Sequence, residues 1–232
     1  MNPGDSKPRD LVLTGFMGTG KTRVGRAVAQ RLGRAFVDMD AEIEARAGKP
    51  IRRIFAEDGE AEFRRMEAAL CAELAPADGH GSGHGSGRVI ATGGGTLVNP
   101  ANRAQLMCRG TIVCLTCHPD EILRRVMAAG RADRPLLSVG DARGELEQLL
   151  ANRQEVYASI PWQVDTTGRS IDDIVNEVAS FAGVESLSVR SPQGEYPVHV
   201  GSGLLPYLGG VLRAAGIAVG TKVTVVSNPV VE

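Results

Sequence analysis

The glycine-rich stretch GFMGTGKT constrains the fold of this chain more than any other feature of its sequence. A short apolar run precedes this stretch and a helix-period segment follows it. Its residues, Gly15-x-x-x-x-Gly20-Lys21-Thr22, match the phosphate-loop pattern in full, in the strand-to-helix context that the pattern requires. An incidental glycine-rich turn with a lysine is the alternative, and it would not require every position of the pattern to match.

Each residue type in this loop has a chemical reason. Glycines let the backbone fold tightly and point successive N–H groups at the β- and γ-phosphates of a nucleotide. The helix that starts there adds the positive end of its dipole. Lys21 brings a mobile positive charge to a transferring phosphoryl group, and the Thr22 hydroxyl can bind Mg²⁺. The loop therefore predicts nucleotide binding, but it does not identify what receives the phosphate.

The rest of the chain alternates short apolar runs with helix-period segments. Strands are expected at residues 11–15, 35–40, 88–95, 111–117 and 163–167. Helices are expected at residues 21–32, 40–47, 51–57, 60–75, 100–108, 119–128, 144–158 and 170–182. Strands separated by helices favour a parallel sheet that helices cover on both faces, with right-handed crossovers. The prediction is an α/β fold.

Composition argues against several classes of function. A net charge of −1 over 232 residues gives no general attraction to nucleic acid or to acidic membranes. No apolar run approaches the roughly 18 residues that a membrane helix needs, and the polar N-terminus lacks the apolar core of a signal peptide. We therefore expect a cytoplasmic protein without nucleic-acid or membrane partners. Four cysteines at this length do not suggest a secreted framework, and the pair Cys114 and Cys117 is interpreted as structural.

Two aspartates stand at the end of the second predicted strand. Asp38 and Asp40 stand two residues apart, and the period of a strand would place both carboxylates on one face. Ligands bind at the carboxyl ends of strands in open α/β sheets. One carboxylate could order the water shell of Mg²⁺, and the other could accept a proton from an attacking hydroxyl. The alternative is that the two aspartates only cap the next helix.

Two further features favour a carboxylic acid as the acceptor. Arg64 and Glu67 stand three residues apart on a predicted helix, so that the glutamate can hold the guanidinium group in place. A fixed arginine suits a planar carboxylate, although an ordinary surface pair has the same spacing. Gly93, Gly94 and Gly95 end the third predicted strand, where a small ligand could touch bare backbone. A β-bulge or a turn is the alternative there.

Two glycine-containing segments interrupt the helical pattern. Residues 128–144 are rich in Gly and Arg between two helices, which suits a lid that closes over a charged site, although a plain basic loop has the same composition. Residues 78–87, DGHGSGHGSG, predict a flexible loop. His80 and His84 have no third ligand nearby, so a solvated loop is favoured over a metal site.

Five motifs together resemble shikimate kinase: GFMGTGKTRVGRAVAQRLG, FVDMDAEIEARAGKPIRRIFAEDGEAEFRRMEA, ATGGGTLV, RADRPLL and NRQEVYASI. They occur in the family's own order, over about residues 9–182. The resemblance implies a P-loop three-layer α/β fold like that of nucleoside monophosphate kinases, with a five-stranded parallel sheet and a lid. It implies transfer of the ATP γ-phosphoryl group to the 3-hydroxyl of shikimate, in chorismate and aromatic amino acid biosynthesis. The segment 78–87 and the continuation YASIPW depart from the family pattern.

For the nucleotide, the resemblance implies a site built from the phosphate loop and three later arginines. The residues implied to contact ATP are Gly18, Thr19, Gly20, Lys21, Thr22, Arg23, Arg125, Arg134 and Arg169. Lys21 would contact the transferring group, and Arg134 would arrive with the lid and neutralise charge. Thr22 would bind Mg²⁺, and Asp38 would reach the metal through water. Arg125 and Arg169 would lie near adenine.

For the acceptor, the resemblance implies a second set of residues. Those implied to bind shikimate are Asp40, Arg64, Gly93, Gly94, Gly95 and Arg153. Arg64 and Arg153 would clamp the carboxylate of shikimate, and Gly94 would lie against its ring hydroxyls. Asp40 is the implied base, so that the implied catalytic set is Lys21, Asp40 and Arg134.

From about Gly183 on, composition and pattern both change. The remaining residues carry few charges, and they predict a β-hairpin around PQG, a helix in LLPYLGGVLRAAG and a buried strand in KVTVVSN. This part resembles the opening of a 3-dehydroquinate synthase, a family that binds NAD and a zinc-type metal in the same pathway. The resemblance implies a multifunctional polypeptide, with a monomeric kinase domain at residues 1–183 linked to an incomplete synthase domain at residues 184–232. The family's NAD turn and metal ligands are not among these residues, so we expect no synthase activity and a poorly sheltered last strand.

Three functions are compatible with the motifs. The first is the shikimate kinase described above, and the second is another small-molecule kinase of the same fold, of the gluconate or nucleotide type. The third is a nucleotide-binding regulator without turnover. Arg64 and Arg153 with the three glycines favour a small hydroxylated acid as acceptor. Lys21, Asp40 and Arg134 argue for an enzyme, because a regulator would not need them together.

Overall fold

The computed structural model describes residues 9–74, 87–128, 142–191 and 194–224. Several residues discussed above lie outside these ranges, namely His80, His84 and Arg134, together with most of the expected lid and the end of the last expected strand. Within the described ranges, none of the helices has the length and apolar character needed to cross a membrane.

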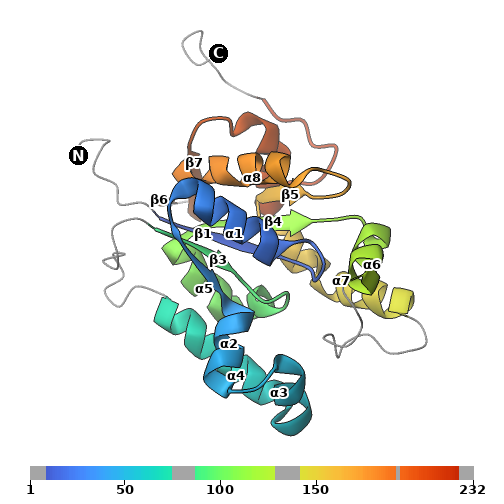
Figure 1. Ribbon diagram of the computed structural model, residues 1–232. Helices are drawn as coiled ribbons and strands as arrows, with labels where there is room; N and C mark the ends of the chain where they lie inside the picture. Colours follow the sequence, from blue (N-terminus) through green and yellow to red (C-terminus); the bar gives the residue numbers. More distant parts are fainter. Residues whose placement is uncertain (1–8, 75–86, 129–141, 192–193, 225–232) are drawn as a thin grey trace.

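Five parallel strands form the central sheet, in the order β2-β3-β1-β4-β5 (Figure 1). The strands are β1 (Asp10–Gly15), β2 (Ala35–Asp38), β3 (Arg88–Ala91), β4 (Gly110–Thr116) and β5 (Trp162–Asp165). In the register of the central strand, Leu13 pairs with Ala91 on one side and with Val113 on the other. The predicted α/β fold with a five-stranded parallel sheet is confirmed.

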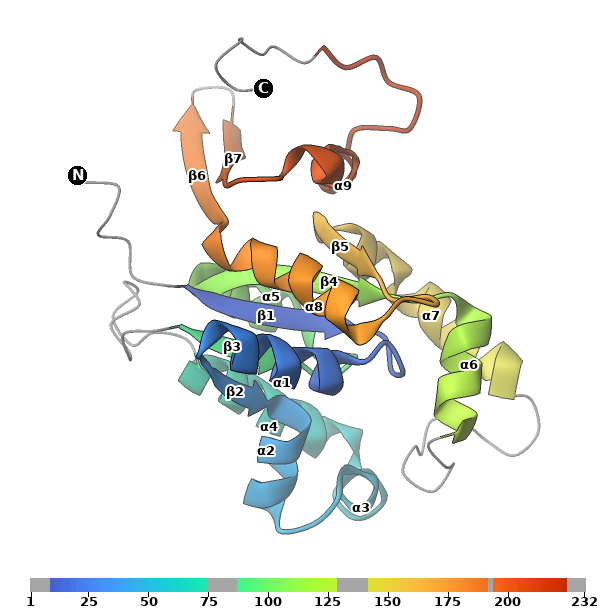
Figure 2. The same cartoon turned by 45° about the horizontal axis from the view of Figure 1, so that its top comes forward.

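Both faces of the sheet are covered, because the residues of the central strand are apolar on both sides. Leu11 and Leu13 pack with α1 (Lys21–Leu32) and α8 (Ile171–Ser180), while Val12 packs on the opposite face. The helices on that opposite face are α4 (Gly59–Leu74), α5 (Pro100–Arg109) and α7 (Ala142–Ala158). Figure 2 shows the sheet lying between α1 with α8 and α5. Such a strand reads as a continuous apolar run in the sequence.

Four further elements surround the carboxyl ends of the strands. They are α2 (Met39–Ala47), α3 (Ile51–Glu57), α6 (Pro119–Ala128) and the short 3₁₀ helix η1 (Thr96–Val98). The 3₁₀ helix η3 (Phe181–Gly183) lies at the opposite end of the sheet, where the Val184 carbonyl that follows it accepts from the Thr111 hydroxyl at the start of β4. Cys114 lies in the core of the sheet, where burial raises the pKa of its thiol to about 12. Cys114 and Cys117 are both free thiols.

Three predicted strands end two or more residues earlier than expected. β2 stops at Asp38, because that side chain accepts backbone hydrogen bonds from Asp40 and Ala41 and so begins α2. The expectation that Asp38 and Asp40 share a strand face is therefore wrong, since Asp40 is the second residue of a helix. β3 stops at Ala91, so the three glycines form a turn beyond the strand. β5 ends at Asp165, before the predicted residue 167.

The segment after Gly183 packs against the rest of the molecule. Its strands β6 (Glu185–Ser191) and β7 (Gly194–Val200) form the predicted antiparallel hairpin. The short helix η4 (Leu205–Tyr207) and α9 (Leu208–Ala214) follow and lie beside β5 (Figure 2). In residues 222–224, the described part of KVTVVSN, the predicted buried strand is wrong: these residues are exposed and pair with no strand.

Candidate active site

A cavity of about 970 Å³ lies at the carboxyl ends of β1, β2 and β3. Of the predicted site residues that the structure describes, all except Thr19 and Arg169 line this cavity. The set comprises Gly18, Gly20, Lys21, Thr22, Arg23, Asp38, Asp40, Arg64, Gly93, Gly94, Gly95, Arg125 and Arg153. The phosphate loop and the two arginines expected to hold a carboxylate therefore face the same space.

The phosphate loop begins at a very close backbone approach. A Cβ atom on Gly15 would lie 2.2 Å from the carbonyl oxygen of Leu115, so only glycine fits. Gly20 adopts φ 94° directly before α1 begins at Lys21, a left-handed conformation that glycine takes without strain. Thr19 faces away from the cavity, since its buried hydroxyl donates to the carbonyl of Phe16 at 2.8 Å. This hydrogen bond stabilises the turn of the phosphate loop.

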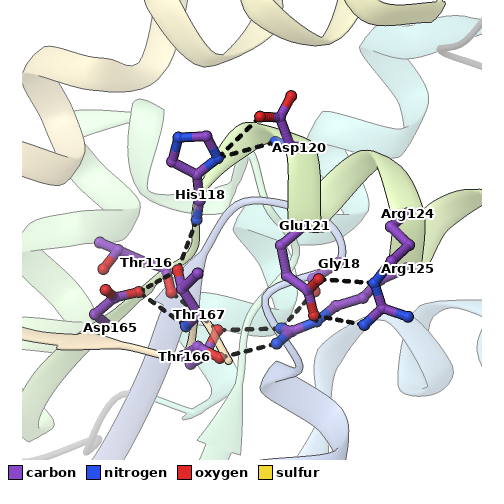
Figure 3. A network of polar contacts seen from close by, with 10 residues as sticks. All are labelled: Gly18, Thr116, His118, Asp120, Glu121, Arg124, Arg125, Asp165, Thr166 and Thr167. Atoms are coloured by element: carbon purple, nitrogen blue, oxygen red, sulfur yellow. Dashed lines mark hydrogen bonds and ion pairs between the residues drawn. The ribbon is translucent and has the colours of Figure 1, made fainter. Parts of the chain in front are cut away.

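The cations beside this loop contact backbone oxygens. The Lys21 ammonium donates to the carbonyls of Gly15 at 2.9 Å and Phe16 at 3.0 Å. The Arg125 guanidinium donates to the carbonyl of Gly18 at 3.3 Å, and to the carbonyl and the hydroxyl of Thr166 at 2.8 and 3.1 Å. Figure 3 shows Arg125 bridging these two segments, with Glu121 on its other side. Carbonyl oxygens are weaker partners for a cation than phosphate oxygens.

Asp38 joins the loop to the start of α2. One carboxylate oxygen accepts from the Thr22 hydroxyl at 2.7 Å, and the other accepts from the backbone N–H groups of Asp40 and Ala41. The capping alternative is therefore realised, and it also orients the carboxylate toward Thr22. The two side chains place a hydroxyl and a carboxylate oxygen side by side at the cavity wall.

Asp40 lies in the cavity wall among groups of both charge signs. Burial raises the pKa of its carboxyl group to about 6 from the ordinary 3.8. The positive charge of Lys21 opposes this rise, while the negative charges of Asp38, Glu67 and Glu44 add to it. A carboxylate with a pKa near 6 is ionised at neutral pH and is a better proton acceptor than an ordinary aspartate.

Glu67 fixes Arg64 from inside the protein. Only 1% of the Glu67 side chain is exposed, so the pair is not an ordinary surface ion pair. One carboxylate oxygen of Glu67 lies 2.5 Å from the Arg64 guanidinium, and the other accepts from the Thr96 hydroxyl at 2.6 Å. Glu60 contacts the same guanidinium at 3.1 Å from the solvent side. Arg64 is therefore oriented by two carboxylates before any ligand arrives.

The three glycines provide space for side chains. A Cβ on Gly93 would lie 2.8 Å from an Asp40 carboxylate oxygen and 2.9 Å from a Glu67 carboxylate oxygen. On Gly94 it would lie 3.0 Å from the Arg153 guanidinium, and on Gly95 2.9 Å from that of Arg64. None of the three has a positive φ, so their conformation does not require glycine. Their lack of side chains lets the two arginines and Asp40 converge.

Arg153 reaches this turn from α7. Its guanidinium lies 5.5 Å from the centre of the Phe16 ring, a cation–π distance. One helical turn later, the Tyr157 hydroxyl donates to the Gly94 carbonyl at 2.6 Å, and burial raises the pKa of that hydroxyl to about 12. Sequence reasoning missed Tyr157, although its spacing of four from Arg153 places both on one helix face.

Arg169 points to a different part of the molecule. Its guanidinium lies 2.6 Å from the Glu177 carboxylate and donates to the Asp165 carbonyl at 3.0 Å. Sequence reasoning also missed an apolar part of the cavity wall, where Ile51, Phe55 and Phe63 contribute from α3 and α4. The rings of Phe55 and Phe63 lie 4.9 Å apart. These residues lie within one of the five motifs, but their apolar side chains alone do not indicate a place in the cavity wall.

Comparison with known proteins gives a consistent result. The family model described as Shikimate kinase matches residues 17–182. A shikimate kinase from Geobacter sulfurreducens is 43% identical over 176 residues, which cover 76% of this chain and 92% of that protein. One from Pelotomaculum thermopropionicum is 43% identical over 173 residues, covering 75% and 95% of the two chains.

Solved structures agree with the sequence matches. The shikimate kinase from Acinetobacter baumannii in complex with shikimate superposes with a TM-score of 0.65 at 34% identity, covering 74% of this chain and 90% of that one. The shikimate kinase from Bacteroides thetaiotaomicron gives a TM-score of 0.63 at 30% identity, covering 73% and 96%. The cavity described above lies within the matched part of the chain.

Proposed function

The chain belongs to the shikimate kinase family, and we propose that it transfers the γ-phosphoryl group of ATP to the 3-hydroxyl of shikimate, giving shikimate 3-phosphate and ADP. One observation carries the proposal: a single cavity joins the phosphate loop to Arg64, Arg153 and Asp40. The loop suits a nucleotide, the arginines suit a carboxylate, and the aspartate lies in the same wall.

Arg64 and Arg153 hold the acceptor through its carboxylate. Their guanidinium groups come from α4 and α7 and lie against the neighbouring residues Gly95 and Gly94. Two arginines can bind the two oxygens of a carboxylate with charge-assisted hydrogen bonds. Gly93 and Gly94 leave room for the ring of shikimate beside the backbone. A ring fixed at one end presents one hydroxyl to the nucleotide.

Asp40 accepts the proton of that hydroxyl. As the oxygen forms its bond to the γ-phosphorus, the bond between that phosphorus and the β–γ bridging oxygen breaks, and ADP leaves with the electron pair. Asp40 takes the proton of the hydroxyl, for which its pKa of about 6 is suited. Lys21 leaves its carbonyl partners and neutralises charge on the transferring group.

Mg²⁺ fits the oxygen atoms of Thr22 and Asp38. A hydroxyl and a carboxylate oxygen 2.7 Å apart are hard donors of the kind this cation prefers, and Mg²⁺ usually keeps waters and phosphate oxygens as its other ligands. Thr22 would bind the metal directly, and Asp38 would order its water shell. The bound cation supplies charge neutralisation at the β- and γ-phosphates.

The remaining nucleotide contacts are part of the same proposal. Gly18, Thr19, Gly20 and Arg23 hold the phosphates, with Thr19 contributing through its backbone because its hydroxyl is used inside the loop. Arg125 lies beside Gly18 and continues the site toward the base of the nucleotide. Arg134 would add a charge to the phosphates, and Arg169 would support the adenine end. The Arg169 side chain turns toward Glu177, so its support would act through the backbone that it holds.

The domain division is also a proposal. Residues 1–183 form the kinase domain, and residues 184–232 are the opening part of a 3-dehydroquinate synthase-like domain on the same polypeptide. The end of the family match at residue 182 and the hairpin beyond it support this division. A cytoplasmic location and a monomeric kinase domain complete the proposal, supported by the family match and by a cavity that one chain lines.

A substrate panel tests the proposed function. ADP formation from ATP and Mg²⁺ is measured with shikimate, gluconate, a set of nucleoside monophosphates, or no acceptor. We expect ADP formation to depend on shikimate and phosphate to appear on its 3-hydroxyl by ³¹P NMR. Turnover with gluconate or a nucleotide in place of shikimate would contradict the acceptor assignment. Nucleotide binding without turnover on any acceptor would favour a regulator.

A further inference from the structure

The segment after Gly183 packs closely against the part of the molecule that contains the cavity. The Tyr207 ring lies 4.7 Å from that of Phe181 and 6.1 Å from that of Trp162, both at steep angles. A Cβ on Gly210 would lie 2.2 Å from the Pro161 carbonyl oxygen, so α9 approaches the start of β5 backbone to backbone. The ring of Tyr207 is packed against these residues, and its hydroxyl is directed at α8.

That hydroxyl begins a chain of polar contacts. It donates to one carboxylate oxygen of Glu177 at 2.8 Å. The other oxygen of Glu177 lies 2.6 Å from the Arg169 guanidinium, which also donates to the Asp165 carbonyl at 3.0 Å. Burial raises the pKa of the Tyr207 hydroxyl to about 12, and the hydrogen bond to Glu177 and the charge of that group add to the rise, so the hydroxyl keeps its proton at neutral pH. Tyr207 thereby reaches the end of β5.

The chain continues into the nucleotide end of the cavity. The Asp165 carboxylate accepts from the N–H and the hydroxyl of Thr167, and the Thr167 hydroxyl accepts from the backbone of His118. Between them, Thr166 accepts from Arg125, which also donates to the Gly18 carbonyl in the phosphate loop. Figure 3 shows this loop after β5 holding Arg125 against the phosphate loop. The steps from Tyr207 to Asp165 and from Thr166 to Gly18 are direct contacts, and a peptide bond joins Asp165 to Thr166.

We propose that Tyr207 and Glu177 are positioning residues for the nucleotide: they hold Arg169, and through it the loop at residues 165–169 that fixes Arg125. The proposal rests on the proposed function, because it requires that the Arg125 side of the cavity binds ATP. Neither residue lines the cavity. Tyr207 also lies beyond the matched kinase region, so the segment after Gly183 contributes to the affinity for ATP.

The predicted effect is selective, because the acceptor residues stand on other elements. Asp40, Arg64 and Arg153 come from α2, α4 and α7, and their recorded partners do not include Glu177 or Tyr207. Loosening the loop after β5 should therefore weaken the binding of ATP and leave the binding of shikimate unchanged. A purely structural role for Tyr207 would lower the melting temperature without separating the two substrates.

The test compares Tyr207→Phe with Tyr196→Phe in the full chain. Tyr196 is half-exposed on β7, in the same segment, and its hydroxyl makes no hydrogen bond to any residue that the structure describes. We expect Tyr207→Phe to raise KM for ATP and the Kd of ADP by about threefold, the size expected for one partly exposed hydrogen bond to a charged group. KM for shikimate and kcat should change less than twofold, and Tyr196→Phe should match the parent.

Glu177→Gln extends the test to the next link. It weakens the contact to Arg169, so KM for ATP should rise by about three- to tenfold. The double variant should show less than the product of the two single effects, because both act on one chain of contacts. Trp162, the only tryptophan of the chain, lies next to this segment, so its fluorescence during ADP titration gives a readout that needs no turnover.

The outcomes separate the two proposals. A parent protein with no shikimate-dependent ADP formation would remove the proposed function itself. An active parent whose Tyr207→Phe variant has unchanged KM for ATP and unchanged ADP affinity would overturn the positioning role alone. Equal increases of KM for ATP and for shikimate would overturn it too, since they would indicate a general loosening of the fold.

Discussion

The two walls of the cavity differ in what their cations contact. On the acceptor wall, Arg64 is paired with the carboxylates of Glu67 and Glu60. On the phosphate wall, the Lys21 ammonium and the Arg125 guanidinium both donate to backbone carbonyls of the phosphate loop. Arg64 is held by ionic contacts that include a buried carboxylate, whereas Lys21 contacts neutral backbone oxygens that a phosphate can replace. Arg125 combines both kinds of contact, since it also pairs with Glu121 at 2.9 Å.

The difference concerns which side must rearrange when ligands bind. Glu67 is buried and held by Thr96, so Arg64 keeps its orientation when shikimate arrives. Lys21 has to leave two carbonyl oxygens to reach a phosphate, and this exchange is favourable because the phosphate is charged. We infer that the fold orients the residues that select the acceptor before it binds. The side chains of the phosphate wall reach their catalytic positions only when the nucleotide binds.

Lys21→Met should give the largest effect and act on the phosphate wall alone. It removes the charge that neutralises the transferring group, so kcat should fall by about 10²- to 10³-fold. The affinity for shikimate, measured by calorimetry, should stay within twofold, because Arg64 and Arg153 are untouched. Lys49→Met is the matched control, since Lys49 pairs with Glu57 and Asp58 outside the cavity wall. A loss of shikimate affinity in Lys21→Met would contradict the separation of the walls.

Arg153→Lys should act on the acceptor wall alone. It replaces a planar guanidinium by a single ammonium, so KM for shikimate should rise by about 10- to 100-fold while KM for ATP stays unchanged. Arg143→Lys is the control, because Arg143 stands on the same helix in exposed ion pairs with Asp120 and Glu147. A shared rise in both KM values would show that the two walls are not independent.

Gly93→Ala should produce an intermediate effect. Its Cβ would displace the carboxylates of Asp40 and Glu67, so kcat/KM for shikimate should fall by about tenfold. Nucleotide affinity should change little. Gly183→Ala is the matched control, because nothing lies within 4 Å of the Cβ it would add and its φ is not positive. Equal activity of Gly93→Ala and the parent would mean that Asp40 does not need its present position.

The smallest effect concerns stability. Because the pKa of Asp40 is about 6 in the folded chain and 3.8 ordinarily, the ionised carboxylate destabilises the fold above pH 6. That cost is about 3 kcal/mol, and it disappears as the pH falls from 6 toward 3.8. Asp40→Asn should therefore melt roughly 6 to 12 °C higher than the parent at pH 7.5. The difference should shrink at pH 4.5, which thermal unfolding at both pH values checks.

The sequence predicted the elements of the kinase part well, because their signals are local. The phosphate loop, its helix and the alternation of apolar runs with helical periods need only neighbouring residues, and α1, α3 and α6 have the predicted bounds. Asp38 and Asp40 were assigned to a strand face because period two fits their spacing. The cap made by Asp38 outweighed that pattern: it ended the strand two residues early and started the helix one residue earlier than expected.

The parts that were missed depend on contacts between distant residues. The spacing of Arg64 and Glu67 could not distinguish a surface pair from a buried one, since the burial of Glu67 depends on Thr96, 29 residues away. Neither the motifs nor the resemblance implied a role for Tyr157 or Tyr207, and their partners Gly94 and Glu177 are distant in sequence. The change in composition after Gly183 indicated a new segment, but it did not indicate that this segment packs against β5 and α8.

The most direct test of the account is the pH dependence of shikimate phosphorylation by the parent and by Asp40→Asn. For the parent, kcat/KM should fall tenfold per pH unit below about pH 6, because Asp40 must be ionised to accept the proton. Asp40→Asn should bind ADP like the parent, turn over at least about 100-fold more slowly, and lack this acidic limb. A variant that turns over like the parent, with the same acidic limb, would contradict the role of Asp40 and with it the proposed chemistry of the cavity.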